Sequence, residues 1–397
     1  MLSKEENELL TRVGPGTPCG ELLRRYWWPV APVQELSDEQ PTRFVRLLGE
    51  DLVLWKDKSG NVGLIQDHCA HRGASLMYGR VEERGISCAY HGWLFNTAGD
   101  CLECPAEPAG SLFHLTVKLR AYPVRPFVGL YWAYLGPLPA PEIPRYDVLA
   151  RHDGHHSVEV HPQLDCNWFQ AMENSVDTAH SRILHASFEG QRDDGRPAPV
   201  NTTRGRTDEV RGFDFYEVPY GIMKKRESRN GHVDEHPLIF PNILRHLNDA
   251  QIRVPIDDTH TYIVFVEFKP SPDGAVVEET ESLPLQYMEQ YKEPAGALHP
   301  NTRFTMHSVQ PQDYMAWETQ GPIADRTVER LATTDRGIVM LREMLRAEIE
   351  KVHRGEDPRC VIRDPNHDLI DTNHSTQMFD HSTAARSVED LVGLTNP

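Results

Sequence analysis

The sequence lacks a hydrophobic run long enough to span a bilayer, which takes about 20 predominantly apolar residues. Its opening segment, Met1 to Asn7, also lacks the apolar core of a secretory signal peptide. Both absences argue against a membrane or secreted protein. We therefore expect a cytoplasmic location.

The sequence is also poor in positive charge. Its 41 Lys and Arg residues stand against 59 Asp and Glu residues, which gives a formal net charge of −18. Nucleic-acid binding requires a basic footprint that compensates the phosphates, so this balance argues against a nucleic-acid partner. An anionic small molecule is still compatible with the chain, because it responds to local charge rather than to the total.

Cysteine is scarce, with seven residues in 397. A cytoplasmic chain keeps its thiols reduced, so these cysteines do not form a disulfide framework. The sequence contains no Gly-x-Gly-x-x-Gly segment, no cysteine set of the plant-ferredoxin type and no internal repeat. We therefore expect that the chain cannot take hydride from NAD(P)H itself.

The length allows two domains, each with its own core. An N-terminal arm is predicted to hold two short helices, over residues 3–12 and 20–26, separated by Gly14-Pro15-Gly16-Thr17-Pro18. From Thr42 to Tyr134 short β-branched and aromatic runs alternate with turn sequences, which predicts a small antiparallel β domain. These runs are Phe44–Leu48, Leu52–Trp55, Val62–Ile65, Ile86–Cys88, Trp93–Phe95 and Gly129–Tyr134.

A proline-rich connector over residues 136–144 predicts a boundary, which divides the chain into domains 1–145 and 146–397. In the second domain, strand-like segments alternate with helical ones, so the fold class predicted is α+β, an antiparallel β domain followed by a mixed sheet with helices. The strand-like segments are Ser157–His161, Phe213–Val218 and Tyr262–Phe268. Residues 187–204 are expected to form a mobile loop, and Asp335–Val352 a long helix.

The segment Glu173–His185 concentrates two histidines and two acidic residues, and we expect it on a helix that begins near Asp165. Two imidazoles and one carboxylate form the facial triad of non-haem Fe(II) sites. However, positions five apart lie about 140° around an ideal helix axis. His180 and His185 can share a metal only if the helix is distorted between them. In a chain with 20 histidines, most such pairs are solvated or structural.

The predicted β domain contains Cys69-Ala70-His71 and Cys88-Ala89-Tyr90-His91. Two Cys/His pairs on two loops can bind a [2Fe–2S] cluster in the Rieske manner, with two thiolates on one iron and two imidazoles on the other. A zinc site is the alternative, although zinc sites usually pair Cys with Cys and His with His. Cys101 and Cys104 follow downstream, either as a redox-active or metal-binding pair or, more simply, as two reduced thiols.

These motifs together resemble the oxygenase (α) component of the Rieske non-haem iron oxygenases, in the branch of phthalate dioxygenases and aromatic O-demethylases. The resemblance also covers the opening Asn7–Pro18 and the segment Gly321–Arg326. It implies a Rieske domain followed by a helix-grip catalytic domain, a [2Fe–2S] cluster and a mononuclear Fe(II). It further implies a head-to-tail homotrimer without a β subunit, a separate reductase or ferredoxin, and O2 and a small aromatic molecule as substrates.

The resemblance assigns roles residue by residue. Cys69, His71, Cys88 and His91 would hold the cluster, and His180 and His185 would hold Fe(II). Asp177, with Asn174 one turn earlier, would be catalytic: Asp177 would contact His180 and reach His71 or His91 of a neighbouring subunit. Asp313 is expected as the third iron ligand. Asp325 is the competitor, and it is expected instead to pair with Arg326 or to cap a helix.

The expected reaction is monooxygenation or O-demethylation of an aromatic acid, and Gln251–Thr261 favours the O-demethylase-like members. One alternative is cis-dihydroxylation of an aromatic ring, as in phthalate dioxygenases. Another, of a different class, is a Rieske electron carrier without oxygenase activity. Arginines beyond the histidine pair could hold the carboxylate by bidentate contact, although for any single one a solvated position is the simpler interpretation. The candidates for substrate binding are Arg204, Arg245 and Arg253.

Overall fold

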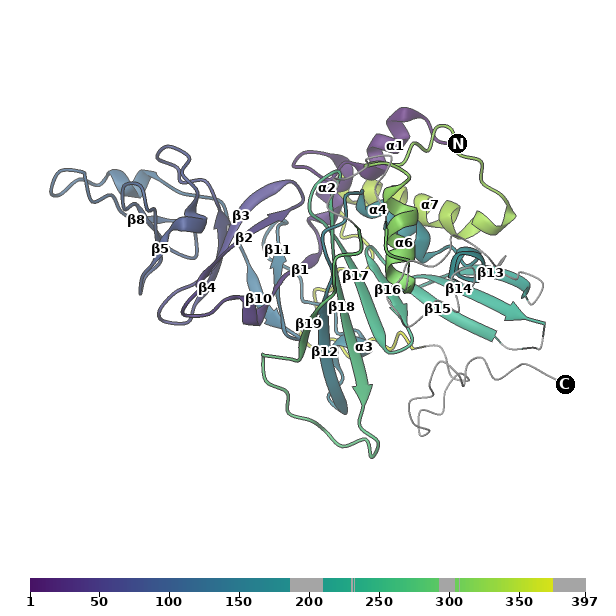
Figure 1. Ribbon diagram of the computed structural model, residues 1–397. Helices are drawn as coiled ribbons and strands as arrows, with labels where there is room; N and C mark the ends of the chain where they lie inside the picture. The colour runs from purple at the N-terminus through teal and green to yellow at the C-terminus, as the bar shows by residue number, and fades with distance from the viewer. Residues whose placement is uncertain (186–209, 230, 232, 293–303, 307, 374–397) are drawn as a thin grey trace.

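A computed structural model describes residues 1–185, 210–229, 231, 233–292, 304–306 and 308–373. The chain forms two lobes (Figure 1). A β-rich lobe at the left holds residues of the N-terminal third, and a larger lobe at the right holds an extended sheet with helices. The expected loop over residues 187–204 and the candidate Arg204 lie outside the described residues.

The N-terminal arm contains the two predicted helices, α1 (Lys4–Thr11) and α2 (Pro18–Leu23). α1 begins at a capping box: the Ser3 hydroxyl accepts from the Glu6 backbone N–H at 3.1 Å, and the Glu6 carboxylate accepts from the Ser3 N–H at 2.7 Å. Both helices pack beside α7 (Arg336–His353), the long helix predicted from its periodicity (Figure 1).

The left lobe consists of antiparallel sheets, as predicted. All six predicted runs coincide with strands to within two residues at each end. One sheet has the order β2 (Thr42–Leu47), β3 (Glu50–Lys56), β4 (Val62–Gln66), β9 (Ala121–Tyr122). The second has β5 (Arg80–Val81), β6 (Ile86–Ser87), β7 (Leu94–Phe95), β8 (Cys101–Glu103). The third, at the junction of the lobes, has β1 (Trp27–Pro32), β11 (Leu130–Tyr134), β10 (Val124–Phe127).

The right lobe is built on an eight-stranded sheet. Its order is β13 (Val210–Val218), β14 (Gly221–Ser228), β15 (Val233–Ile239), β16 (Ile243–His246), β17 (Asp249–Pro255), β18 (Thr261–Pro270), β12 (Gly154–Val160), β19 (Leu285–Tyr287). Only the β12–β19 pair is parallel, so the sheet is mixed and the α+β prediction is confirmed. α4 (Trp168–Ser175), α6 (Val309–Glu318) and α7 lie on one side of it (Figure 1).

The prediction that strands alternate with helices throughout this lobe was wrong for β13 to β18, which follow one another as antiparallel neighbours. The charged residues of β14 obscure the alternation expected for a half-buried strand. The remaining helices are short: α3 (Asp147–Ala150), η1 (Val33–Glu35), η2 (Leu76–Tyr78), η3 (Phe113–Thr116) and η5 (Thr333–Asp335).

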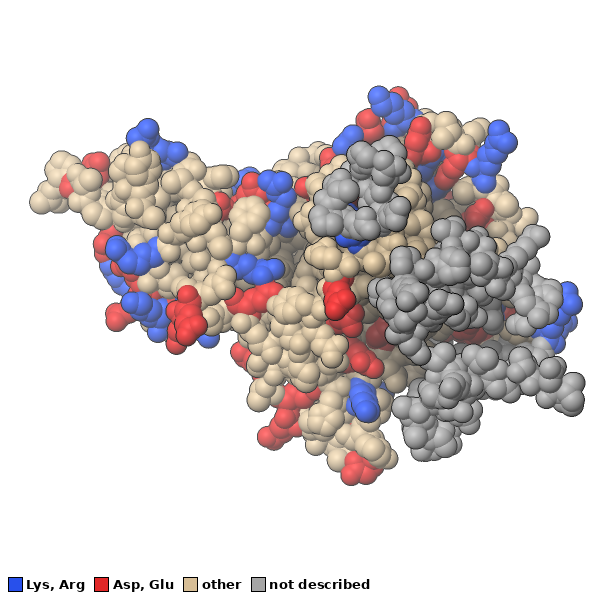
Figure 2. All heavy atoms as spheres, viewed as in Figure 1, with Lys and Arg blue, Asp and Glu red and all other residues tan. Residues whose placement is uncertain are grey.

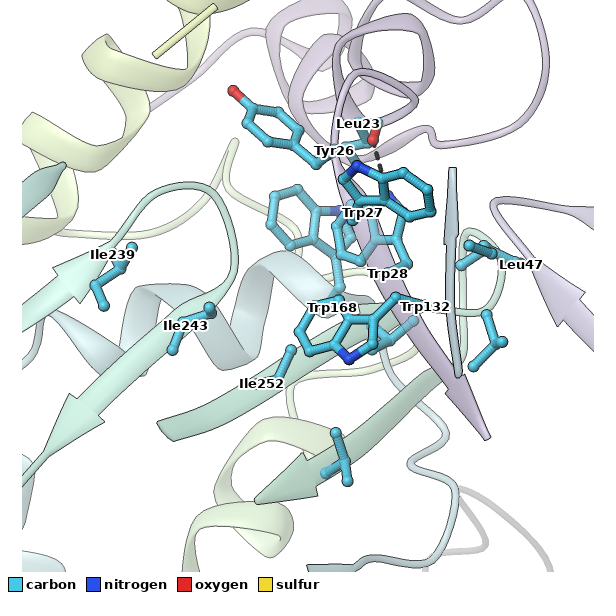
Figure 3. Packing of buried hydrophobic residues seen from close by; sticks show 14 of the residues in the cluster. Leu23, Tyr26, Trp27, Trp28, Leu47, Trp132, Trp168, Ile239, Ile243 and Ile252 are labelled. Atoms are coloured by element: carbon cyan, nitrogen blue, oxygen red, sulfur yellow. Dashed lines mark hydrogen bonds between the residues drawn. The ribbon is translucent and has the colours of Figure 1, made fainter. Parts of the chain in front are cut away.

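One hydrophobic core joins the two lobes. Trp27 and Trp28 from β1, Trp132 from β11 and Trp168 from α4 meet there, and the eight-stranded sheet contributes Ile252 (Figure 3). The indole N–H of Trp28 donates to the Leu23 carbonyl at 2.8 Å, so even this fully buried ring has its polar atom satisfied. The lobes are therefore fixed to each other by shared packing. The domain division at residue 145 stays a prediction.

Candidate active site

The histidine-bearing segment is broken into two helical pieces. α4 ends at Ser175, residues 176–179 are not helical, and a π-helix covers Ser181–His185. The predicted distortion between His180 and His185 is therefore confirmed, while the prediction of one helix through the whole segment was wrong. A π-helix closes i→i+5 hydrogen bonds, and its wider turn brings residues five apart onto the same side.

The distortion lets the two imidazoles converge on one carboxylate. Asp313 Oδ1, on α6, lies 3.7 Å from His180 Nε2 and 3.5 Å from His185 Nε2. Each of the three residues offers one ligand atom, and these atoms lie within 4.8 Å of one another. Burial raises the pKa of Asp313, although His180, His185 and Arg253 act in the opposite direction. Two imidazoles and a buried carboxylate that forms no ion pair with a Lys or Arg among the described residues fit a divalent iron.

Two side-chain amides, those of Gln312 and Asn174, hold the ligand side chains in place. His185 Nδ1 lies 2.9 Å from Gln312 Oε1, and the Gln312 amide N–H donates to the Met306 carbonyl, which sets its orientation. Asn174 Nδ2 donates to Asp313 Oδ1 at 3.5 Å. The Gln312 contact leaves Nε2 of His185 facing Asp313, which is the usual way in which outer partners orient metal-binding histidines. The sequence did not indicate Gln312, whose only signal is its position before Asp313.

Asp177 lies in the break between the two helical pieces. Its Oδ1 accepts from the Ala179 N–H at 2.7 Å, and its Oδ2 lies 3.3 Å from His180 Nδ1, as an ion-pair contact rather than a well-aligned hydrogen bond. Burial opposes ionisation of Asp177, but His180 and the backbone N–H groups outweigh it and lower its pKa.

The competitor Asp325 lies elsewhere. It is exposed, and its carboxylate accepts from the Thr327 backbone N–H at 3.0 Å. The expectation that it pairs with Arg326 was wrong, because Arg326 is fully buried and donates to Glu173 at 2.6 Å and 2.9 Å. The Gly321–Arg326 segment is thus tied to α4 through Glu173.

The four cluster candidates lie at the far end of the left lobe. Cys69 and Cys88 are buried, whereas His71 is exposed and its Nδ1 lies 3.1 Å from His91 Nδ1. The two loops have the same backbone turn. The Gly73 N–H donates to the Cys69 carbonyl and the Gly92 N–H to the Cys88 carbonyl, each at 2.8 Å, and both glycines have positive φ. The ring of Trp93 stacks on His71, with 4.5 Å between ring centroids.

The spacing of these four donors distinguishes a cluster from zinc. Among the described residues, the only group of three or more His, Cys, Asp or Glu donors within 4.8 Å of one another is His180, His185 and Asp313. A tetrahedral zinc would draw all four donors to one point, whereas a [2Fe–2S] cluster holds two pairs apart. Burial also raises the pKa of the Cys69 thiol to about 11. A bound metal would therefore be needed to hold this sulfur as a thiolate at neutral pH. Cys101 and Cys104 are free thiols with 3.7 Å between their sulfur atoms.

The metal triad opens on a cavity of about 570 Å³ between the sheet and α6. Of the candidate substrate residues, Arg253 lines this cavity and Arg245 does not. Arg245 lies between Leu244 and His246 on β16, and alternate residues of a strand face opposite sides. Its guanidinium instead donates to Asp147 at 3.2 Å on the other face of the sheet, which corrects the expectation of a role in substrate binding.

Comparisons of sequence and fold agree with this geometry. The family model described as "Rieske [2Fe-2S] domain" matches residues 26–123, and the one described as "LigXa C-terminal domain like" matches residues 286–370. Dicamba monooxygenase bound to dicamba has the same fold, with a TM-score of 0.58 at 16% identity, over 84% of this chain and 99% of that chain. Pseudomonas putida CBB5 NdmA has a TM-score of 0.56 at 19% identity, over 87% and 97%.

The curated relatives extend the match to nearly the whole chain. The sequence is 41% identical over 376 residues to the 5,5'-dehydrodivanillate O-demethylase oxygenase subunit of Sphingobium sp. (strain NBRC 103272 / SYK-6), covering 92% of this chain and 84% of the relative. It is 36% identical over 394 residues to the phthalate 4,5-dioxygenase oxygenase subunit of Pseudomonas putida, covering 90% and 88%. The chain belongs to the Rieske non-haem iron oxygenases, as the oxygenase subunit of a multicomponent system.

Membership confirms the expected class, fold and cofactors, a [2Fe–2S] cluster with a mononuclear iron, together with a need for O2 and a reductase. It disfavours the alternative of an electron carrier without oxygenase activity. In addition, every helix among the described residues is too short or too polar to cross a bilayer.

Proposed function

We propose that this subunit catalyses the O2-dependent monooxygenation of an aromatic acid, with O-demethylation of a methoxy group as the favoured form. The observation that carries the proposal is the pairing of a two-histidine, one-carboxylate triad with a cavity of about 570 Å³ that holds both cations and aromatic side chains. That volume suits a small aromatic ligand. Similarity to an O-demethylase subunit at 41% identity supports the choice of reaction.

His180, His185 and Asp313 would hold the iron, which supplies O2 activation when it is bound. Gln312 and Asn174 would keep His185 and Asp313 in the geometry that the metal needs, through the contacts at 2.9 Å and 3.5 Å. Arg253 is a cavity-lining cation whose charge acts on the triad, because it opposes the rise that burial causes in the pKa of Asp313. Its guanidinium N–H groups donate to Gln251 at 2.7 Å and 3.1 Å, so it would act mainly by its positive charge.

Cys69 and Cys88 would hold one iron of the cluster, and His71 and His91 the other. Within one chain these residues lie on the left lobe, away from the triad under α6 (Figure 1). An electron would therefore reach the triad from the cluster of a neighbouring subunit. Asp177 lies where it could link His180 to a cluster histidine of that neighbour.

The surface around the cluster supports a head-to-tail homotrimer. The end of the left lobe has few charged side chains on the visible face (Figure 2). Exposed apolar and aromatic residues occur along residues 78–115 of this lobe, among them Tyr90, whose ring contacts that of His91. Exposed apolar patches commonly mark protein contacts. The exposed residues are Tyr78, Tyr90, Leu112, Phe113 and Leu115, each 46% or more exposed. Elsewhere on this face, basic and acidic residues are interspersed (Figure 2).

The test is product analysis by mass spectrometry with a surrogate reductase, on matched pairs of aromatic acids with and without a methoxy group. O-demethylation predicts a phenol and formaldehyde from each methoxylated acid. Ring cis-diols from the unsubstituted acids, with methoxy groups retained, would instead establish the dihydroxylation alternative. Iron content is the check on the site: the cluster contributes two irons and the triad a third.

A further inference from the structure

Two cysteines that have no part in the proposed function lie beside the cluster loops. Cys101 and Cys104 are free thiols, and their sulfur atoms are 3.7 Å apart. Cys101 is 3% exposed, whereas Cys104 is half-buried. The two residues therefore form a close thiol pair with one buried and one accessible member.

A β-bulge in β8 supports the contact between the two sulfur atoms. Residues three apart on a regular strand point to opposite faces of a sheet. In β8, however, the pairing with β7 shifts by one residue between Cys101 and Glu103, so Leu102 is an extra residue on this strand. An extra residue of this kind returns Cys104 to the face of Cys101. The backbone itself therefore favours the pairing of these thiols.

A disulfide suits this pair better than a bound metal does. The sulfur atoms have to approach by only about 1.6 Å to reach the length of an S–S bond. Among the described residues, no third His, Cys, Asp or Glu donor lies within 4.8 Å of both sulfurs to complete a metal site. Burial raises the pKa of both thiols, to about 12 at Cys101, which disfavours thiolates. A disulfide carries no charge and meets no such cost.

The pair packs against the residues that would hold the cluster. Cys101 shares one buried apolar core with both cysteine ligands, and Cys104 packs against that core. The next residue, Pro105, covers the turn of the second cluster loop, because a Cβ atom built on Gly92 would lie 3.2 Å from Pro105 Cγ. Chemistry at Cys104 therefore takes place directly beside this loop.

We propose that Cys101 and Cys104 respond to peroxide by forming a reversible disulfide beside the cluster loops. The oxidant is hydrogen peroxide, which forms when O2 takes up two electrons and two protons without oxidising a substrate. Peroxide transfers one oxygen atom to the Cys104 sulfur, which gives a sulfenic acid and one water. The Cys101 sulfur then attacks that sulfur, the S–O bond breaks, and a second water leaves as the disulfide forms.

Trapping by Cys101 keeps the oxidation of Cys104 at a reversible stage. A sulfenic acid without a neighbouring thiol is oxidised further to a sulfinic acid, which thiols do not reduce. A sulfinic acid is anionic, and a charge in half-buried surroundings is costly. The pair thus spares the second cluster loop a permanent charge at its turn.

Tandem mass spectrometry of the digested protein tests the proposal. The reduced holoenzyme is treated with hydrogen peroxide and then alkylated with N-ethylmaleimide. In the wild type, the segment with Cys101 and Cys104 should be lighter by two hydrogen atoms and carry no alkyl group, and dithiothreitol should restore both thiols. In Cys101→Ala, Cys104 should become a sulfinic acid, and the visible spectrum of the cluster should fade sooner than in the wild type.

Cys360→Ala is the matched control, because Cys360 is a half-buried free thiol outside the β domain. It should change neither the disulfide nor the rate of fading. Two alkylated thiols or a sulfinic acid at Cys104 in the treated wild type would overturn the proposal, and so would a disulfide between Cys104 and Cys69. Equal fading in the wild type and Cys101→Ala would overturn the protective role. The mapping of the wild type needs no variant.

Discussion

Replacing Glu173 by Gln tests how α4 is anchored to the Gly321–Arg326 segment and to α7. Glu173 is 8% exposed and accepts from Arg326 at 2.6 Å and from Arg342 at 2.7 Å. Arg342 keeps a second partner in Glu329, but Arg326 keeps only neutral groups, the Asn7 side chain and the Ala324 carbonyl. The substitution therefore leaves a fully buried guanidinium without a counter-charge.

Breaking a buried pair in this way costs about 3–5 kcal/mol, which is a large part of the stability of an ordinary domain. For a domain of about 250 residues, that corresponds to a fall in Tm of roughly 6–20 °C. Differential scanning calorimetry of the holoenzyme measures it. Glu329→Gln is the matched control. Glu329 is 20% exposed and Arg342 retains Glu173, so the expected cost is about 1 kcal/mol.

The effect should also depend on pH. Burial opposes ionisation of Glu173, but Arg326 and Arg342 outweigh it and lower its pKa. A carboxyl group with a lowered pKa in the folded state contributes stability that is present above its unfolded pKa and is lost as pH falls through the folded value. The difference between wild type and Glu173→Gln should thus shrink below about pH 4.5. A Tm difference under 2 °C at pH 7, or one that grows on acidification, would refute the reasoning.

Three further outcomes are expected. His180→Ala should abolish turnover and leave the visible spectrum of the cluster intact, since the two sites share no residue; loss of the spectrum would contradict their separation. Asp177→Asn should retain both metals yet slow electron delivery about tenfold or more, because Asp177 would link the subunits; stopped-flow single-turnover kinetics measures this, and wild-type rates would exclude that role. Lys224 lines the cavity, and burial lowers its pKa to about 8. Its positive charge favours an anionic ligand, so the Kd for an aromatic carboxylate should rise as pH increases above about 8. Lys224→Arg, which stays charged, should remove that rise, and an identical pH profile in both proteins would assign it to another group.

The cluster loops could be predicted from the sequence because their ligand types and local spacing already define the chemistry. The histidine pair could be found in the same way, and even the helix distortion followed from a spacing of five. Asp313 required the resemblance to a family, since it lies 128 positions after His185 and no local pattern links them.

The charged residues that line the cavity could not be predicted, and the reason is physical. Lys224 and Arg226 interrupt the apolar alternation that identifies a strand, because β14 faces a polar cavity rather than a core. Similarly, Arg245 and Arg253 look equivalent in the sequence. Strand pairing alone decides that Arg253 faces the cavity and Arg245 faces Asp147.

The tryptophan core at the junction of the lobes has a consequence for recombination within this family. Trp27, Trp28, Trp132 and Trp168 come from the arm, the left lobe and the catalytic lobe, and they bury one another. A chimaera that exchanges only residues 26–123 would separate Trp27 and Trp28 from the ring partners with which they pack. A chimaera that keeps this packing would therefore have to include the N-terminal arm and β11 together with the Rieske domain. The segment to be exchanged is thus longer than residues 26–123, which the family model matches.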